Sequence, residues 1–453
     1  MDATTARLVD FALGFDPARL PAAAVHAAKA RVLDSIGCGL AAYFAPPIRA
    51  LRRVAPDVTG SWSARLWGSG ARTTPDIAAL VNGSMVRYLD LNDAYRTLDA
   101  AHPSDNLPGL LAVAEARALP GRDLILALAI SYEIQCRFTD TVPFNAEGWD
   151  QPVVGAVAAA LGAGRVMGLD RDALGHAVAL AIVPHLATYQ TRAGELAMWK
   201  GCAGPNGARH GIFAARLAEE GMTGPYDAFE GVFGIWNQTL RAPGTFTLPG
   251  PDHPGPFGLQ QSNIKRYPVR DSCQLPIDTA LDLRAKLDGR RAVKLHVGTY
   301  KSAHLGAVAD RELWAPQTRE TADHSMPFSI AAGLLDGTVT AETFERRRFL
   351  DADLLDTIRA MEVEILPEFS AATPALRNCR ITATLESGAR VVAHRQLSQA
   401  EIERGTPDDV LEAKFDGLVR RQLPETTRRA IVDAVWTLNT APRVDHLVDL
   451  LVF

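Results

Sequence analysis

Asp90, Asp93 and His102 bring three acid–base side chains together over a short stretch of the chain. If the apolar helix that precedes them continues, the two carboxylates lie one turn apart on the same helical face. Two close carboxylates separate their pKa values, and an imidazole titrates near pH 7, so this group suits proton transfer. The alternative interpretation is a solvated acidic helix end followed by a loop.

A second group of residues surrounds Lys200. Trp199 precedes it and a run of Gly and Ala follows, so we expect its ammonium to be shielded from solvent and to act as a point charge for an anion. The small residues allow the backbone to approach a ligand, and the helix that starts nearby would aim free N–H groups at a carboxylate. Arg192 lies just upstream. The alternative is a surface lysine beside a helix start.

A third group follows a Pro- and Gly-rich loop over residues 248–257. Lys265, Arg270 and Ser272 crowd a turn at an expected domain junction, where ligand sites commonly lie. His324 stands further along the chain beside a helix start, a position where a histidine is more often structural.

The elements that position these groups change character along the chain. About the first 240 residues show apolar positions three and four apart, with start signals such as Asp170 and stop signals such as Gly168 and Gly221, which indicates consecutive helices. From about residue 245 onward, β-type alternation appears between helical runs, with Ser387-Gly388 as a hairpin turn. The C-terminal part is helical again. The pattern predicts a mainly α protein: a large all-helical domain from residues 1–265 and 408–453, and an inserted α+β domain from residues 266–407.

Composition excludes several classes of function. The chain of 453 residues has 47 Lys+Arg against 52 Asp+Glu, a net charge of −5, so no broad basic surface for nucleic acid or an anionic membrane is expected. Its five cysteines lie far apart without metal-ligand spacing, so no metal or iron–sulfur cofactor is expected. No signal peptide or membrane span is predicted. We therefore expect a cytoplasmic protein.

Several strings of residues, in this order over nearly the whole chain, resemble the MmgE/PrpD family. They are Asn82–Asp93 with His102-Pro103-Ser104, Gly148-Trp149-Asp150, Met198–Gly201, Gly221–Pro225 with Phe229-Glu230-Gly231, Ile264–Pro268, and Ala322–Pro327 with Leu335-Asp336-Gly337. The resemblance implies that the inserted domain is a lid, that the protein is a homodimer, and that it is a cofactor-independent lyase or related enzyme for small di- or tricarboxylates. Known activities in the family include 2-methylcitrate dehydration, citrate dehydration, cis-aconitate decarboxylation and iminodisuccinate epimerisation.

The resemblance also places residues in the pocket and marks this chain as a divergent member. Asp90, Asp93, His102 and Lys200 stand at positions that the family uses there. The departures from the family pattern are Ala94 where a decarboxylase-type member has Thr, Gln151 where many members have His, Ser272 where dehydratase-like and decarboxylase-like members have His, and Phe328 where Tyr is common.

The leading hypothesis is dehydration of a 2-methylcitrate-like or citrate-like acid. Lys200, with Lys265 or Arg270, holds carboxylates and stabilises developing charge, while His102, tuned by Asp93 or Asp90, is the general acid or base. The remaining expected substrate-binding residues are Ser272, Gln151, Arg192 and His324. The alternatives are decarboxylation of a cis-aconitate-like acid, epimerisation of an iminodisuccinate-like acid, and a degenerate member that binds an acid without turnover.

Overall fold

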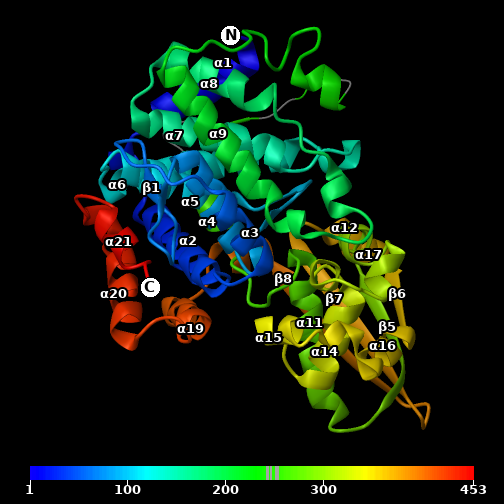
Figure 1. The fold of residues 1–453 in the computed structure, drawn as a ribbon. Coiled ribbons are helices and arrows are strands. Elements are labelled where there is room, and N and C mark those ends of the chain that lie inside the picture. The colour runs from blue at the N-terminus through cyan, green and yellow to red at the C-terminus, as the bar shows by residue number, and fades with distance from the viewer. Residues whose placement is uncertain (241–243, 245–246, 250–254) are drawn as a thin grey trace.

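The first lobe of the protein is built from helices at both ends of the chain (Figure 1). The computed structural model describes residues 1–453 except 241–243, 245–246 and 250–254, so part of the loop predicted at 248–257 lies outside the described residues. The long helices of this lobe are α1 (Ala3–Gly14), α2 (Ala22–Ala41), α3 (Pro46–Val54), α4 (Pro75–Tyr88), α5 (Leu107–Ala116), α6 (Gly121–Thr141), α7 (Pro152–Met167), α8 (Arg171–Ile182), α9 (Ala203–Glu219), α19 (Asp408–Val419) and α20 (Glu425–Trp436). The short helices are α10 (Gly258–Gln261) and α21 (Asp445–Asp449).

Local signals explain where several of these helices begin and end. The Asp170 carboxylate accepts a hydrogen bond from the N–H of Ala173 and caps α8. Gly168 ends α7 with a φ of 83°, a conformation that side chains with a Cβ rarely adopt. These signals were the ones expected from the sequence.

Two small hairpins interrupt the helices, and neither was expected. Strands β1 (Ala64–Arg65) and β2 (Arg72–Thr73) pair antiparallel, as do β3 (Tyr95–Arg96) and β4 (Ala100–Ala101). Each strand has only two residues, too short for a recognisable alternation. The β3–β4 hairpin follows α4 and carries residues that reach the cavity described below.

The second lobe contains a four-stranded sheet in the order β6-β5-β7-β8. Its strands are β5 (Ala292–Thr299), β6 (Met361–Ile365), β7 (Leu376–Leu385) and β8 (Arg390–Ser398). Strands β5 and β6 are parallel, and the other pairs are antiparallel, with Leu295 opposite Ala383 and Ile381 opposite Ala393. The β7–β8 hairpin turns at Gly388, as predicted, because its φ of 79° suits glycine.

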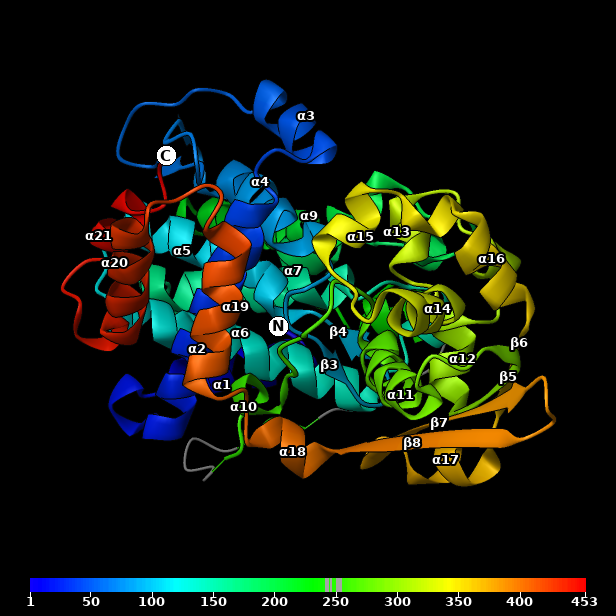
Figure 2. The same cartoon turned by 90° about the horizontal axis from the view of Figure 1, so that it is seen from below.

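Helices cover this sheet and connect its strands. They are α11 (Asp271–Leu287), α12 (Lys301–Ala307), α13 (Arg319–Ala322), α14 (Met326–Asp336), α15 (Ala341–Glu345), α16 (Ala352–Arg359), α17 (Pro367–Ala372) and α18 (Gln399–Glu403). Helix α11 packs on α14 and on strands β7 and β8 (Figure 2). The prediction of a mainly α protein with a small α+β part is confirmed.

Two large apolar cores lie inside the molecule. The first contains residues between Leu8 and Ile264 together with residues between Leu411 and Leu451, and α19 packs against α2 (Figure 2). The second contains residues between Val269 and Ala393. The domain boundaries at 265/266 and 407/408, and the closing motion of a lid, stay predictions.

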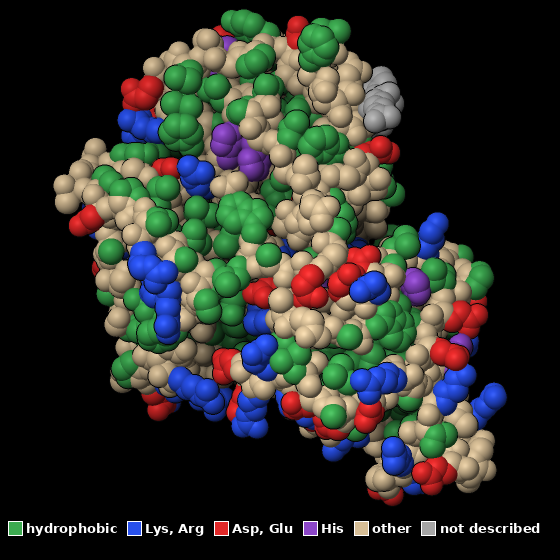
Figure 3. Space-filling view, turned by 45° about the vertical axis from the view of Figure 1, so that its right-hand side comes forward, with side chains coloured by type: hydrophobic (Ala, Val, Ile, Leu, Met, Phe, Trp, Pro, Cys, Tyr) green, Lys and Arg blue, Asp and Glu red, His purple; other side chains and the backbone are tan. Residues whose placement is uncertain are grey.

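The charged side chains on the surface, the cysteines and the lengths of the helices can be compared with what the composition predicted. Basic and acidic side chains are interspersed on the face shown in Figure 3. All five cysteines are buried and free. None of the helices in the described part of the chain combines the length and apolar content needed to cross a membrane.

Candidate active site

A cavity opens between the helical lobe and the start of the second lobe. It encloses about 460 Å³, counting its opening to solvent. The first lobe contributes Arg87, Asp90, Ala94, Tyr95, Arg96, Ala100, Ala101, His102, Asn145, Asp150, Gln151, Tyr189 and Arg192, and the second contributes Arg270, Asp271 and His324. Four of these side chains are arginines, so the cavity suits a small anion with several carboxylates.

Asp90 lies at the bottom of this cavity, directly after α4 ends. The helix stops at Tyr88, and Asp90 takes a φ of 52°, so the carboxylates of Asp90 and Asp93 do not share a helical face as expected. The Asp90 carboxylate instead contacts three cations: Arg87 Nη1 at 2.9 Å, Lys200 Nζ at 3.2 Å, and Lys265 Nζ. Burial alone would raise the pKa of Asp90, but these cations outweigh burial and hold that pKa well below its ordinary value.

Lys200 joins Asp90 to a second buried carboxylate. Its Nζ lies 2.5 Å from Oδ1 of Asp323, and its side chain is only 1% exposed, as the expectation of a shielded lysine requires. Arg319 Nη1 also approaches Asp323, at 3.4 Å. Asp90 and Asp323 are therefore surrounded by four cations, Arg87, Lys200, Lys265 and Arg319. This buried network carries an excess of positive charge beside the cavity.

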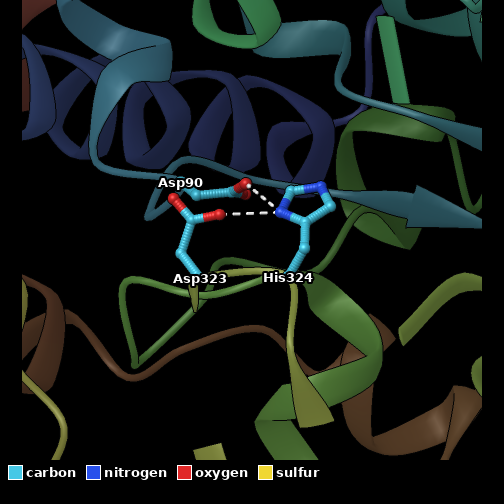
Figure 4. Close-up of side chains that lie close together, drawn as sticks. All are labelled: Asp90, Asp323 and His324. Atoms are coloured by element: carbon cyan, nitrogen blue, oxygen red, sulfur yellow. Dashed lines mark hydrogen bonds and ion pairs between the residues drawn. The ribbon is translucent and has the colours of Figure 1, made fainter. Parts of the chain in front are cut away.

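His324 is held by this network with one ring nitrogen and faces away from it with the other. Its Nδ1 lies 2.7 Å from Oδ1 of Asp323 and 3.6 Å from Oδ2 of Asp90 (Figure 4). Burial first, and then Lys200, lowers the pKa of His324 well below its ordinary value, so the ring is neutral at pH 7. The contact with Asp323 places the single proton on Nδ1. Nε2 therefore keeps its lone pair, and Figure 4 shows it on the far side of the ring from both carboxylates.

His102 has both ring nitrogens engaged by the protein. Nδ1 lies 2.7 Å from the backbone oxygen of Asp93, and Nε2 lies 3.0 Å from Nη2 of Arg87. Burial, followed by the nearby Arg87, lowers the pKa of His102 well below its ordinary value. A neutral ring that donates from Nδ1 and accepts at Nε2 orients Arg87 toward Asp90 and the cavity. His102 thus contacts the backbone oxygen of Asp93, and not the Asp93 carboxylate that was expected to adjust its pKa.

Four predicted site residues are not part of the cavity lining: Lys200 and Lys265, which belong to the buried network, and Asp93 and Ser272. The Asp93 carboxylate accepts the backbone N–H of Ser104 at 3.2 Å, which fixes the loop before His102. Ser272 lies in the first turn of α11, and its hydroxyl is buried without a hydrogen-bond partner among the described residues. Asp93 and Ser272 are close to the site in sequence, but their side chains lie outside the cavity lining.

Arg192 and Gln151 line the cavity, and two buried acids, Asp150 and Asp105, hold their side chains. Arg192 Nε lies 3.1 Å from Oδ2 of Asp150, and its Nη1 donates to the carbonyl of Lys200 at 3.0 Å. Gln151 Nε2 donates to Oδ2 of Asp105 at 3.2 Å. Burial raises the pKa of Asp105 to about 7, against the effect of Arg87 and Arg192. Gln151 therefore anchors Asp105 and cannot itself carry a proton as a histidine would.

The glycines that follow Lys200 lie against other parts of the protein. In α9, a Cβ at Gly207 would lie 2.7 Å from the Pro152 carbonyl oxygen, and one at Gly211 would lie 2.1 Å from the Ala156 carbonyl oxygen. These glycines allow α9 to pack closely on α7. Gly204, which is nearer to Lys200, lies instead against the side chains of Asp105 and Gln151, so close approach of the backbone to a ligand stays a prediction.

Asp90, Asp323 and His324 also present ligand atoms close enough together for a metal ion. The Lys200 ammonium, however, lies within hydrogen-bond distance of both carboxylates and 3.4 Å from Nδ1 of His324. A fixed cation already neutralises the donor set, so a divalent ion placed there would be repelled by it. The residues present suit an ammonium rather than a metal.

Sequence reasoning missed several residues of the site. Arg87, Arg96, Tyr189 and Asp271 line the cavity, and Asp323 lies directly behind it. Arg87 precedes Asp90 by one helical turn, and Asp323 is the immediate neighbour of His324, so both had a local signal. Arg96 and Asp271 had none, since their partners come from distant parts of the chain.

Comparison with known proteins identifies the family of this chain. Residues 6–245 match the MmgE/PrpD N-terminal domain, and residues 267–439 match the MmgE/PrpD C-terminal domain. The chain is 27% identical to cis-aconitate decarboxylase of Homo sapiens, over 94% of this chain and 90% of that protein. It is also 27% identical to 2-methylcitrate dehydratase of Cupriavidus necator, over 91% of this chain and 89% of that protein. Because the two family matches together span most of its length, the chain belongs to the MmgE/PrpD family.

Proposed function

We propose that this protein is a lyase that dehydrates a small hydroxy-polycarboxylate by side-chain acid–base catalysis. The observation that carries the proposal is the neutral His324, which is oriented by Asp323 and presents a free Nε2 in a cavity lined by arginines. Similarity to 2-methylcitrate dehydratases and cis-aconitate decarboxylases supports an acid with several carboxylates as the substrate.

The cations of the site bind the substrate and stabilise developing charge. Removal of a proton beside a carboxylate places negative charge on that group, and fixed cations in a buried site stabilise this charge without reorganisation. Lys200 and Arg87 belong to the network with excess positive charge, and Arg192 lines the same cavity. In this proposal Arg87 and Arg192 hold the carboxylate beside the reacting carbon, Lys200 adds positive charge from the buried network, and Lys265 keeps Asp90 in place.

His324 is the proton carrier in the proposed reaction. Its Nε2 removes the proton from the carbon beside the carboxylate, and the electron pair of that C–H bond forms the C=C double bond. The C–O bond to the hydroxyl group breaks at the same time, and the imidazolium returns its proton to the departing hydroxide, which leaves as water. Asp323 stabilises the imidazolium, and His102 is a positioning residue that orients Arg87.

Decarboxylation is the second candidate, and one observation favours it. His102 has both nitrogens engaged, so among the histidines that line the cavity only His324 has a ring nitrogen available for proton transfer. Loss of carbon dioxide leaves an electron pair that needs a single reprotonation, so one carrier is sufficient. Epimerisation needs an acid and a base on opposite faces of the carbon, and the described residues do not favour it.

A panel of substrates distinguishes these candidates. The purified protein would be incubated in D₂O with 2-methylcitrate, citrate and cis-aconitate, and followed by proton NMR and by carbon dioxide release. Dehydration gives an alkene signal without carbon dioxide, and decarboxylation gives both an alkene and carbon dioxide. Binding of these acids without any product would contradict both candidates and indicate a protein that only binds acids.

Substitution of the proton carrier should abolish most turnover. His324→Gln keeps the size of the side chain but removes the titrating nitrogen, so we expect kcat to fall roughly 10²- to 10⁴-fold with little change in melting temperature. Lys200→Met should reduce turnover at least as strongly. The control is His296→Gln, since that side chain is 42% exposed and pairs with Glu364 outside the cavity. Wild-type kcat in His324→Gln would refute the assignment.

We also propose that the protein acts as a homodimer, as expected from the family resemblance. One chain has a mass of 48.8 kDa, so a homodimer should have twice that mass. Sedimentation equilibrium measures this directly, and a single species at the mass of one chain across micromolar concentrations would reject the proposal.

A further inference from the structure

Two arginines at the edge of the cavity next to the second lobe lack a carboxylate of their own. Arg96 comes from the β3–β4 hairpin and Arg270 precedes α11, and both line the cavity. The charge network of Asp90 and Asp323 includes neither of them.

Asp271 is the acid nearest to Arg96, but another arginine already uses it. Arg377 Nη1 donates to Oδ2 of Asp271 at 2.7 Å, and Asn263 donates to Oδ1 at 3.2 Å. Arg96 Nε lies 3.5 Å from the same Oδ2, is buried, and has no hydrogen-bond partner among the described residues. A buried guanidinium donor without a partner is costly, and a ligand carboxylate would satisfy it.

Arg270 lies in a similar position. No carboxylate lies within ion-pair distance of its guanidinium in the part of the chain that the structure describes, and burial, which lowers the pKa of Arg270, is outweighed chiefly by Tyr189, which raises it. Burial, and then Arg270, lowers the pKa of Arg96, which is the effect of a like charge close by. Two neighbouring guanidinium groups thus face one cavity, and Asp271, which lies near Arg96, is already paired with Arg377.

Gly306 in α12 makes room for Arg270. A Cβ at this position would lie 2.5 Å from Nη2 and 2.8 Å from Cζ of Arg270. The glycine therefore allows the guanidinium to lie against α12 at the cavity edge. This makes Gly306 a positioning residue for Arg270.

We propose that Arg96 and Arg270 together form a subsite for an additional carboxylate of the substrate, the one by which a tricarboxylate differs from a dicarboxylate. Two guanidinium forks can each donate paired hydrogen bonds to a carboxylate. The proposal rests on the proposed function, because it assumes that this cavity takes a polycarboxylate. It extends that function by assigning the choice of substrate class to Arg96, which the sequence alone did not single out.

Calorimetric titration with two unreactive acids tests the subsite. Propane-1,2,3-tricarboxylate has three carboxylates, glutarate lacks the central one, and neither has a hydroxyl group to eliminate. The wild-type protein should bind the tricarboxylate more tightly. In Arg96→Gln and Arg270→Gln, we expect the affinity for the tricarboxylate to fall roughly 10- to 100-fold while the affinity for glutarate changes much less, so that the preference disappears.

Further variants separate a lost subsite from a damaged fold. Arg96→Lys keeps the charge but not the fork and should retain part of the preference. Gly306→Ala keeps both arginines but displaces Arg270, and should lose the preference like Arg270→Gln. Arg311→Gln is the matched control, because that side chain is 95% exposed. Within the described residues its ion-pair partner is Glu312. Melting curves accompany each titration.

The outcomes decide the proposal independently of catalysis. The proposal is overturned if Arg96→Gln keeps the preference for the tricarboxylate, or if it loses affinity for both acids equally. It is also overturned if the wild-type protein binds neither acid. If the preference depends on Arg96 but no acid in the substrate panel is dehydrated or decarboxylated, the subsite stands and the proposed function fails. If dehydration occurs without any such preference, the proposed function stands and the subsite fails.

Discussion

Asp90 illustrates how a single residue combines backbone conformation with charge. A φ of 52° is unfavourable for a residue with a side chain, although aspartate tolerates it better than most. The conformation directs the carboxylate to Arg87, Lys200 and Lys265, and the backbone oxygen of Asp90 accepts a further hydrogen bond from Lys265 at 2.9 Å. These contacts compensate the cost of the left-handed conformation.

Asp105 should make the stability of the protein depend on pH. Burial raises its pKa to about 7, whereas an aspartate in the unfolded chain titrates near 3.9. Between these values the folded state holds a proton that the unfolded state has released. The contribution of Asp105 to the free energy of unfolding therefore falls as pH rises from about 4 to about 7, by up to about 1.4 kcal/mol for each pH unit.

Comparison with Asp105→Asn isolates this effect, since all other groups titrate equally in both proteins. Urea denaturation of the two proteins would be measured across this pH range. The free energy of unfolding of the wild type minus that of the variant should decrease with rising pH and become constant above about pH 7. A difference that is flat, or that increases with pH, would show that Asp105 is ionised throughout.

Helix α9 shows how an element carries both packing and function. It begins three residues after Lys200, and its Gly207 and Gly211 face α7 at distances that leave no room for a Cβ. The same helix also packs on α4, which ends just before Asp90, and Lys200 contacts the carboxylate of Asp90. The packing of these helices is thus part of the geometry of the site.

Gly211→Ala should destabilise the protein, although alanine usually favours a helix. The new Cβ would lie 2.1 Å from the carbonyl oxygen of Ala156, so α7 and α9 must separate, at a cost of about 1–3 kcal/mol. Gly14→Ala is the control, since a Cβ there meets no atom of the described residues within 4 Å. Thermal unfolding should show a lower midpoint for Gly211→Ala only, and equal midpoints would contradict the close packing.

At the scale of the whole molecule, the C-terminal part of the chain supports the site. Lys414 in α19 pairs with Asp34 of α2 at 2.5 Å. The same ammonium donates to the carbonyls of Leu91 at 3.0 Å and Lys265 at 2.7 Å. These two carbonyls belong to the segments that carry Asp90 and the Lys265 side chain, so α19 fixes both segments.

Lys414→Met should therefore affect stability and turnover together. It leaves the Asp34 carboxylate, which is 2% exposed, without its cation, and loss of one member of a buried pair costs roughly 3–5 kcal/mol. We expect a lower melting temperature and a lower kcat. Lys301→Met, at an exposed position, should change neither quantity. A variant at residue 414 with normal stability and kcat would exclude this supporting role.

Much of the fold and part of the site followed from the sequence alone. The capping carboxylate of Asp170, the turn glycines at Gly168 and Gly388 and the alternation along β7 act over a few residues, so their structural consequences are local and readable. The family resemblance likewise identified His102 and Lys200 as candidates, and His324 was expected as a substrate-binding residue. The structure places Lys200 and His324 in one network.

Only the tertiary structure decided which side chains meet and in what state of charge. Lys200 contacts Asp90 and Asp323, which lie 110 and 123 residues away, and Arg96 shares Asp271 with Arg377. Such contacts depend on the packing of whole helices, and the pKa of each group depends on its burial and neighbours. For this reason the sequence assigned the proton carrier to His102, whereas the fold engages both nitrogens of His102 and leaves Nε2 of His324 free.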